Sequence, residues 1–162
     1  GKSMQELLAT SVELNVVDGV ILPNLKMQGT REACAYLDAE GRCSIHPYRP
    51  GICRLFPLGR HYENGGLFYF LQTGECVKEN RSKVKVSKWI DTPELKRNEQ
   101  FKLQWHDLLS AMTDRVAGED EGKQREENLL LLRLFYLLPY EGTTDFYSQF
   151  TERMGHWNEQ IG

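Results

Sequence analysis

Apolar residues recur at steps of three and four through most of the second half of the chain, a spacing that predicts α-helices. The first helix is predicted to begin at 92–94, where Thr, Pro and Glu supply a cap, a proline at the first helical position and an acid in the first turn. Its apolar face comprises Phe101, Trp105, Leu108, Leu109, Met112 and Val116. Two more helices are predicted, a central one over about 124–138, apolar nearly all round, and one over about 144–160.

The first half of the chain has shorter stretches of regular apolar spacing. Ser3 and Glu6 have the spacing of a capping box and predict a helix over about 3–10. Residues 16–27 alternate loosely around Asp18-Gly19, a turn signal, and this pattern predicts one or two short strands.

Residues 28–57 are rich in Gly, Pro, Cys and Arg and show no sustained period, so we expect a loop-built segment with a tight turn at 38–41. Two β-prone runs, 60–62 and 67–71, then flank an Asn-Gly pair, which is a strong hairpin signal.

The predicted fold class is therefore α+β. A small loop- and hairpin-built cysteine module, about 16–90, precedes a helical half of about three helices, about 92–160. At this length, residues 1–162 are expected to form a single domain. The opening Gly-Lys-Ser-Met does not look native, so we expect that residues are missing upstream.

Charge and hydropathy restrict the partners of this chain. Twenty Lys and Arg against 23 Asp and Glu give a net charge of −3, so we do not expect the surface as a whole to bind nucleic acid. The longest apolar run, 129–138, is interrupted by Arg133 and is too short to span a bilayer. We therefore expect a soluble, cytoplasmic protein with no membrane partner.

The four cysteines, Cys34, Cys43, Cys53 and Cys76, all lie between positions 34 and 76, and clustering of this kind favours a shared site. Their thiolates are the predicted metal ligands. Four thiolates suit either zinc or an iron–sulfur cluster, and both centres then carry a net charge near −2.

Arginines surround these cysteines. Residues 42–61 contain four Arg and no Asp or Glu, and a buried anionic centre needs such cations or N–H donors nearby. Arg49 and Arg54 are the predicted charge-balancing residues around the centre. Pro47, Pro50 and Pro57 stiffen the loop that carries Cys53.

Other interpretations of the cysteines stay open. They could be inert core residues, since free cysteine is often buried, or they could form two disulfides. A covalent cysteine catalyst is poorly supported, because no cysteine has an obvious base beside it in the sequence. His46 is a weaker candidate ligand, and His61, His106 and His156 are weaker still.

The cysteine segment resembles a known family. Residues 34–37 read Cys-Ala-Tyr-Leu, 41–46 read Gly-Arg-Cys-Ser-Ile-His, and 49–57 read Arg-Pro-Gly-Ile-Cys-Arg-Leu-Phe-Pro. This pattern is similar to that of the YkgJ-like cysteine-cluster family, whose members are described as zinc- or iron-chelating domains. The resemblance covers about a quarter of the chain, and the run from Arg49 to Pro57 is its most specific part.

One departure from the family pattern affects the choice of cofactor. Members normally carry a C-x-x-C-C group upstream, and no cysteine precedes Cys34 here. Either the chain has been cut after that group, which we favour given its start, or this member has lost it. If the missing cysteines are also ligands, the four present would complete two part-sites and not one closed site. Together with the long, irregular spacing, this favours a [4Fe–4S] cluster over zinc.

These residues are consistent with three functions. The first is metal binding through the four cysteines, structural or electron-transferring. The second is a redox or protein-modifying enzyme, since flagellin lysine methylases carry a similar cysteine cluster, although no catalytic constellation is recognisable here. The third is a regulatory or nucleic-acid-binding module that uses the arginines.

Overall fold

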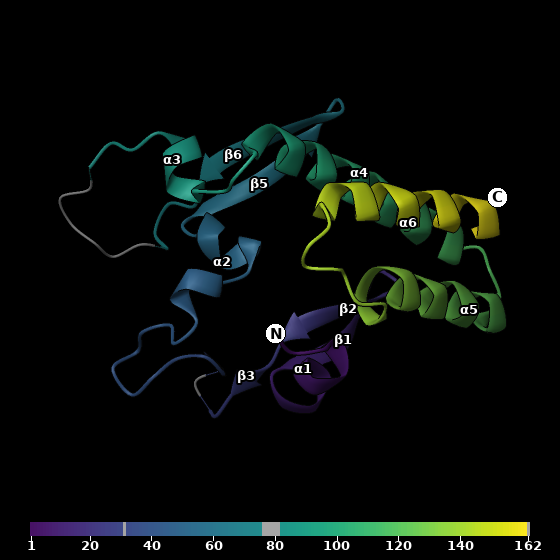
Figure 1. Ribbon diagram of the computed structural model, residues 1–162, viewed down its shortest axis with the longest axis horizontal. Helices are drawn as coiled ribbons and strands as arrows, with labels where there is room; N and C mark the ends of the chain where they lie inside the picture. The colour runs from purple at the N-terminus through teal and green to yellow at the C-terminus, as the bar shows by residue number, and fades with distance from the viewer. Residues whose placement is uncertain (31, 76–81, 162) are drawn as a thin grey trace. The chain divides into compact units, whose positions relative to one another are not determined.

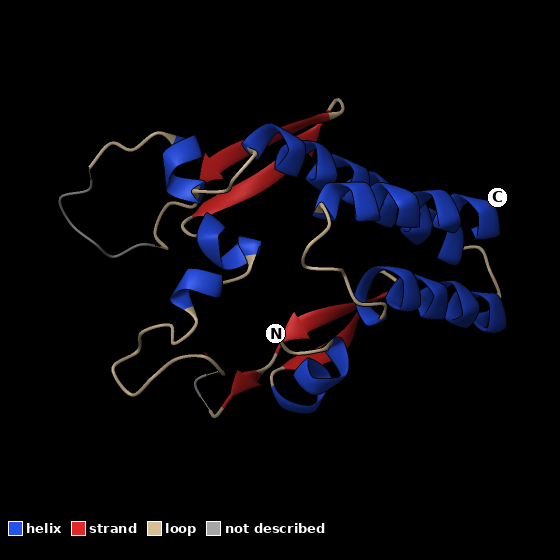
Figure 2. Cartoon of the chain, in the orientation of Figure 1, coloured by secondary structure: helices blue, strands red, loops and turns tan. Residues whose placement is uncertain are grey.

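The computed structural model describes residues 1–30, 32–75 and 82–161, and the chain forms two compact units. Unit 1 comprises Gly1–Ala35 and Leu108–Gly162, and unit 2 comprises Tyr36–Asp107. Small antiparallel hairpins precede a series of helices (Figures 1 and 2), which confirms the predicted α+β class. That the 162 residues form a single domain stays a prediction.

Unit 1 begins with the predicted capping box. The Ser3 hydroxyl accepts a hydrogen bond from the Glu6 amide at 3.3 Å, and the Glu6 carboxylate accepts one from the Ser3 amide at 2.7 Å. Helix α1, Met4–Thr10, follows this cap, as predicted. The reciprocal bonds satisfy two amides at the helix start that have no partner within the helix.

The predicted strands of unit 1 form a hairpin. Strand β1, Val12–Val17, pairs in antiparallel register with β2, Val20–Leu25. The turn between them is formed by Asp18 and Gly19, which both have positive φ, 50° and 81°. The first strand begins four residues before the predicted start, because α1 ends at Thr10 and Val12 belongs to the alternating pattern. Two further short strands, β3 (Met27–Gln28) and β4 (Ala33–Cys34), pair with each other.

A buried asparagine ties this hairpin to the helices of unit 1. Asn128 lies on α5, Glu121–Leu132, with 3% of its surface exposed. Its Oδ1 accepts a hydrogen bond from the Ile21 amide at 2.6 Å, and its Nδ2 donates to the carbonyl oxygens of Gly19 at 3.1 Å and Gln124 at 2.8 Å. The side chain therefore satisfies backbone groups on both elements.

The long helix starts later than predicted. Helix α4 runs over Leu95–Val116, and Pro93 is not its first helical residue, because Glu94 has a left-handed φ of 49° that no α-helix contains. Three residues of the predicted apolar face, Leu108, Met112 and Val116, are buried.

The predicted helix over 124–138 is shorter and changes form. Helix α5 passes into a π-helical segment, η2, Arg133–Leu137. Leu129 is 54% exposed, so this helix is not buried on every side.

The third predicted helix is α6, Phe146–Ile161. It packs against η2 through aromatic side chains, with the Phe135 ring centroid 5.8 Å from that of Phe150 and 6.2 Å from that of Trp157. The core of unit 1 lies between these elements.

Arg153 of α6 holds the end of η2. Its guanidinium donates to the carbonyl oxygens of Leu134 at 2.7 Å, Leu138 at 2.9 Å and Pro139 at 2.8 Å, and it lies 3.6 Å from the centre of the Tyr140 ring. Carbonyl oxygens at a helix end lack hydrogen-bond donors within the helix, and here one side chain donates to three of them.

Tyr136 of η2 gives unit 1 a predicted weakness at alkaline pH. Burial raises its pKa to about 12, with the neighbouring Tyr140 adding to the effect. The unfolded phenol ionises near pH 10, whereas the folded one keeps its proton, so the free energy of unfolding falls as the pH rises from 10 to 12. At about 1.4 kcal/mol per pKa unit, the loss reaches at most about 3 kcal/mol.

Urea unfolding at pH 7, 10 and 11 tests this prediction. Tyr136→Phe should lose less stability with pH than the unaltered chain, and the control Tyr48→Phe, at an 85% exposed position, should not differ from it. Equal alkaline losses for Tyr136→Phe and the unaltered chain would contradict the prediction.

Among its described residues, unit 2 contains the predicted second hairpin and three short helical elements. Strand β5, Leu58–Glu63, pairs with β6, Gly66–Leu71, across Asn64-Gly65, which confirms the hairpin. The segment expected to be loop contains a 3₁₀ helix, η1, His46–Tyr48, and α2, Gly51–Leu55. Helix α3, Val86–Ile90, was not predicted. Within the described ranges, no helix is both long and apolar enough to cross a membrane.

Candidate metal centre

The structure describes three of the four predicted ligands. Cys34, Cys43 and Cys53 are each half-buried, and Cys76 lies outside the described residues. Within the described part of the chain, no disulfide joins the three to one another. A half-buried sulfur is accessible to a metal, whereas a cysteine used only as a small core residue is usually fully buried.

Cys34 is held by a strand of unit 1. It is the last residue of β4 and pairs with Met27 of β3. The next amide, that of Ala35, donates to the carbonyl oxygen of Lys26 at 3.4 Å. The backbone on both sides of Cys34 is therefore fixed by pairing with the same short segment.

Cys43 lies in unit 2, just after the predicted tight turn. The Asp38 carboxylate accepts hydrogen bonds from the amides of Glu40 at 3.1 Å and Arg42 at 2.8 Å, and the Gly41 amide donates to the Asp38 carbonyl oxygen at 3.0 Å. This confirms the turn at 38–41. Cys43 then forms a β-bridge with Leu37, so the turn brings the chain back beside itself at this cysteine.

Cys53 lies on α2 and not in a loop as expected. Its amide donates to the carbonyl oxygen of Pro50, the N-cap of this helix, at 3.0 Å. Pro50 has φ −55° and ψ 155°, the extended geometry that allows a helix to begin at the next residue. The proline that was predicted to stiffen the approach to Cys53 thus also starts the helix that carries it.

Arg54 fixes the loop around Cys53 through three carbonyl oxygens. Its guanidinium donates to those of Pro47 at 3.2 Å, Arg49 at 3.4 Å and Asp91 at 3.1 Å. One side chain therefore joins η1, the start of α2 and the end of α3. A role for Arg54 or the half-buried Arg49 in balancing the charge of a metal centre stays a prediction.

Removing the Arg54 guanidinium should loosen this loop. We expect Arg54→Ala to lower the free energy of unfolding by about 2–3 kcal/mol, because three carbonyl oxygens lose a charged donor. Arg42→Ala is the matched control, since Arg42 is exposed and makes its described contacts through its backbone, and it should cost less than about 0.5 kcal/mol. Urea denaturation of both variants measures the difference, and equal midpoints would show that Arg54 does not hold the loop.

The histidines have other surroundings. His46 is exposed, His61 lies 3.5 Å from the Glu63 carboxylate, and the His106 ring stacks on that of Tyr62 with centroids 3.9 Å apart. His156 has Glu159 as a neighbour at 3.5 Å. Among the residues that the structure describes, no three His, Cys, Asp or Glu side chains converge.

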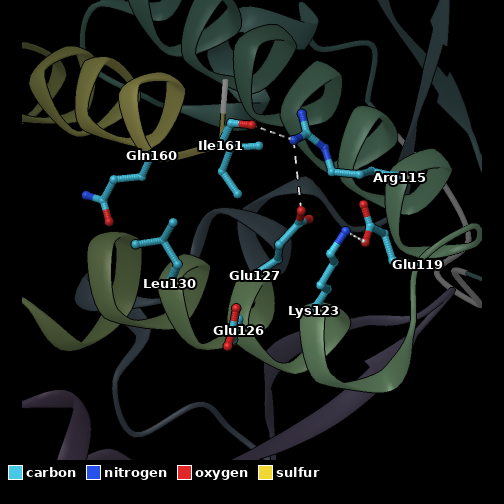
Figure 3. A pocket seen from close by; sticks show the side chains of 8 residues that line it. All are labelled: Arg115, Glu119, Lys123, Glu126, Glu127, Leu130, Gln160 and Ile161. Carbon is cyan, nitrogen blue, oxygen red and sulfur yellow. Dashed lines mark hydrogen bonds and ion pairs between the residues drawn. The ribbon is translucent and has the colours of Figure 1, made fainter.

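Unit 1 has a cavity of about 550 Å³ between α5 and the ends of α4 and α6 (Figure 3). Its cations are engaged, since Lys123 lies 3.0 Å from the Glu119 carboxylate and Arg115 donates to the Ile161 carbonyl oxygen at 3.0 Å. Glu127 points toward Arg115 at 3.9 Å, and burial raises its pKa. These contacts tie the helices of unit 1 together.

Sequence reasoning missed a group of polar residues on unit 2. Arg60 of β5, Tyr69 of β6 and Lys102 of α4 lie near one another, with Lys102 Nζ 3.4 Å from the Tyr69 hydroxyl. Burial raises the pKa of Tyr69 to about 12, with Glu99 contributing, and burial together with Arg60 lowers that of Lys102. The only sequence signal was the arginine count, which did not distinguish Arg60 from its neighbours.

Comparisons with known proteins identify the family. Neither a curated protein nor a solved structure matches the chain. The model of the CxxCxxCC family, described as "Putative zinc- or iron-chelating domain", matches residues 3–87, which is just over half of the 162 residues. The match includes all four cysteines, although the chain has no cysteine before Cys34. The chain therefore belongs to the CxxCxxCC family of zinc- or iron-chelating domains.

Proposed function

We propose that this protein holds a metal centre through the thiolates of Cys34, Cys43, Cys53 and Cys76, and that the native centre is a [4Fe–4S] cluster. Thiolates are suitable ligands for iron–sulfur clusters and for zinc. The long, irregular spacing of the cysteines favours the cluster. When bound, the cluster would supply electron transfer or structural support.

The observation that carries this proposal is the small core of unit 2. Among the described residues of Tyr36–Asp107, the buried apolar side chains are those of Leu55 and Ile90. Apolar burial on this scale does not offset the conformational entropy of ordering such a segment. Small modules of this kind are usually stabilised by a metal or by disulfides, and unit 2 contains three of the four cysteines.

The local geometry of two cysteines is consistent with ligand roles. The bridge to Leu37 fixes the backbone of Cys43, and the bond to Pro50 together with the Arg54 contacts fixes that of Cys53. A backbone held in this way lowers the conformational entropy that a ligand loses when the metal binds.

Anaerobic purification, followed by a visible absorption spectrum and elemental analysis, tests the proposal. A brown protein that contains iron and sulfide and absorbs near 400 nm supports the cluster. A colourless protein with stoichiometric zinc would support the cysteine site but would show that its metal is zinc and not an iron–sulfur cluster. Full retention of metal by Cys43→Ser and Cys53→Ser variants would exclude these residues as ligands.

A further inference from the structure

Unit 2 has a groove along one edge of its hairpin. The groove has a volume of about 440 Å³ and lies between α2 with its C-cap, lined by Ile52, Leu55 and Phe56, and β5, lined by Leu58 and Arg60. Most of its lining is apolar, and Ile52 and Phe56 are 60% and 50% exposed. We call it the β5 groove.

The edge of β5 that lines this groove has unpaired backbone groups. The two-residue turn at 64–65 makes Glu63 and Gly66 a hydrogen-bonded pair, so the pairs alternate from there along the hairpin. The hydrogen bond from the Gln72 amide to the Pro57 carbonyl oxygen, at 3.0 Å, fits the same alternation. Leu58, Arg60 and Tyr62 therefore direct their amides and carbonyls away from β6.

Nothing in the described ranges pairs with that edge, since β5 has β6 as its only strand partner there. The residues with outward backbone groups, Leu58, Arg60 and Tyr62, all line the groove. An edge of this kind is a template for another strand, and natural proteins usually cover or block it. Its spacing of donors and acceptors suits an extended polypeptide backbone.

The charge at the groove is positive. The half-buried Arg60 guanidinium donates no hydrogen bond within the described ranges, and Lys102 is close enough for the two cations to repel each other. Glu99 is the carboxylate that faces this pair, and it also acts on the Tyr69 hydroxyl. A guanidinium binds a carboxylate with two parallel hydrogen bonds, so a second acid beside Arg60 would be favourable.

We propose that the β5 groove binds an extended polypeptide segment as a third strand on β5, with an acidic side chain beside Arg60 and an apolar side chain against Ile52 and Phe56. Successive side chains of a strand point to opposite faces of the sheet, and directly opposed residues lie on the same face. The side chain opposite Arg60 therefore lies on the same face as Arg60. The segment would lie beside α2, the helix that carries Cys53. The proposal does not depend on the identity of the metal.

A second copy of this chain is a less suitable occupant. Symmetrical antiparallel pairing of two β5 edges centred on Arg60 would place one arginine directly opposite the other. Like charges in opposed positions destabilise a strand pair. An acidic partner avoids this repulsion.

Titration of the full chain, with its metal as purified, tests the proposal. The probes are the pentapeptides Thr-Val-Glu-Leu-Thr-amide and its counterpart Thr-Val-Gln-Leu-Thr-amide, each with fluorescein attached to the N-terminal amine, and binding is followed by fluorescence anisotropy. We expect the Glu peptide to bind at least tenfold more tightly than the Gln peptide. Arg60→Gln should remove this difference, because the charge-assisted hydrogen bonds are then lost. The control Lys96→Gln, an exposed lysine of α4, makes the same charge change and should keep the difference.

Amide hydrogen exchange locates the bound peptide independently of the variants. Exchange at Leu58, Arg60 and Tyr62 should slow when the Glu peptide binds, whereas Gly59 and His61 already bond to β6 and should change little. No saturable binding at millimolar peptide, or equal effects of Arg60→Gln on both peptides, would overturn the proposal. Protection of the same amides that rises with protein concentration without peptide would assign the edge to a second copy and also overturn it.

Discussion

Removal of the metal should unfold Tyr36–Asp107, with a lower melting temperature and a loss of amide protection throughout unit 2. Structural metal binding to thiolates contributes on the order of 10 kcal/mol to folding. Unit 2 has little else to stabilise it, because among its described residues the buried apolar side chains are those of Leu55 and Ile90. An ordinary domain has a free energy of unfolding of about 5–15 kcal/mol. The stability that unit 2 is expected to lose with the metal therefore exceeds the lower end of that range, about 5 kcal/mol.

Thermal melting with and without a strong chelator measures this effect, and hydrogen exchange assigns it to a unit. Cys53→Ser should reproduce the effect of the chelator, because serine is a poor replacement for a thiolate ligand. Ser87→Ala, an exposed position on α3 in the same unit, is the control and should melt with the unaltered protein. Identical melting of a metal-loaded and a chelated sample would contradict the prediction.

Replacement of Asn128 by alanine should cost about 3–5 kcal/mol in unit 1. The change removes the partner of the Ile21 amide and one partner of the Gly19 carbonyl oxygen, and it leaves a void beside α5. Each buried backbone group without a partner costs about 1–3 kcal/mol, and the cavity adds to this. Urea denaturation followed by circular dichroism measures the loss.

Asn158→Ala serves as the matched control for that experiment. Asn158 is an exposed residue of α6, so the same chemical change there should fall within about 0.5 kcal/mol. Asn128→Asp should also destabilise the unit, because it removes the donated hydrogen bonds and buries a carboxylate. If Asn128→Ala unfolds at the same urea concentration as Asn158→Ala, the hairpin is not held by this side chain.

Local sequence signals predicted the elements that depend on neighbours in the chain. Ser3 with Glu6, Asp18-Gly19 and Asn64-Gly65 act within a few residues, and each is found where the pattern indicated. The predicted start of α4 was wrong, because Glu94 has a left-handed backbone and the helix begins only after it, despite the favourable cap and proline that precede it.

Contacts between distant residues could not be predicted from local patterns. Asn128 looks like an ordinary polar residue on a helix, and its role follows only from a hairpin about a hundred positions earlier. Arg54 was singled out as a cation for a metal centre, whereas its described contacts are with backbone carbonyls of three segments. The cysteines were recognisable because ligand chemistry restricts residue type, but no local pattern specifies which cations approach them.

The division of unit 1 into two segments has a consequence for synthesis on the ribosome. The β1–β2 hairpin emerges early, yet Asn128, which binds Ile21, follows 107 residues later. During that interval Leu14, Val16 and Val17, which are exposed even in the complete structure, have no α5 beside their hairpin. All of unit 2 emerges in the meantime, so the cysteines proposed there as ligands are accessible before unit 1 can close. Slow translation between these segments would therefore lengthen the time in which the nascent hairpin can aggregate or recruit a chaperone.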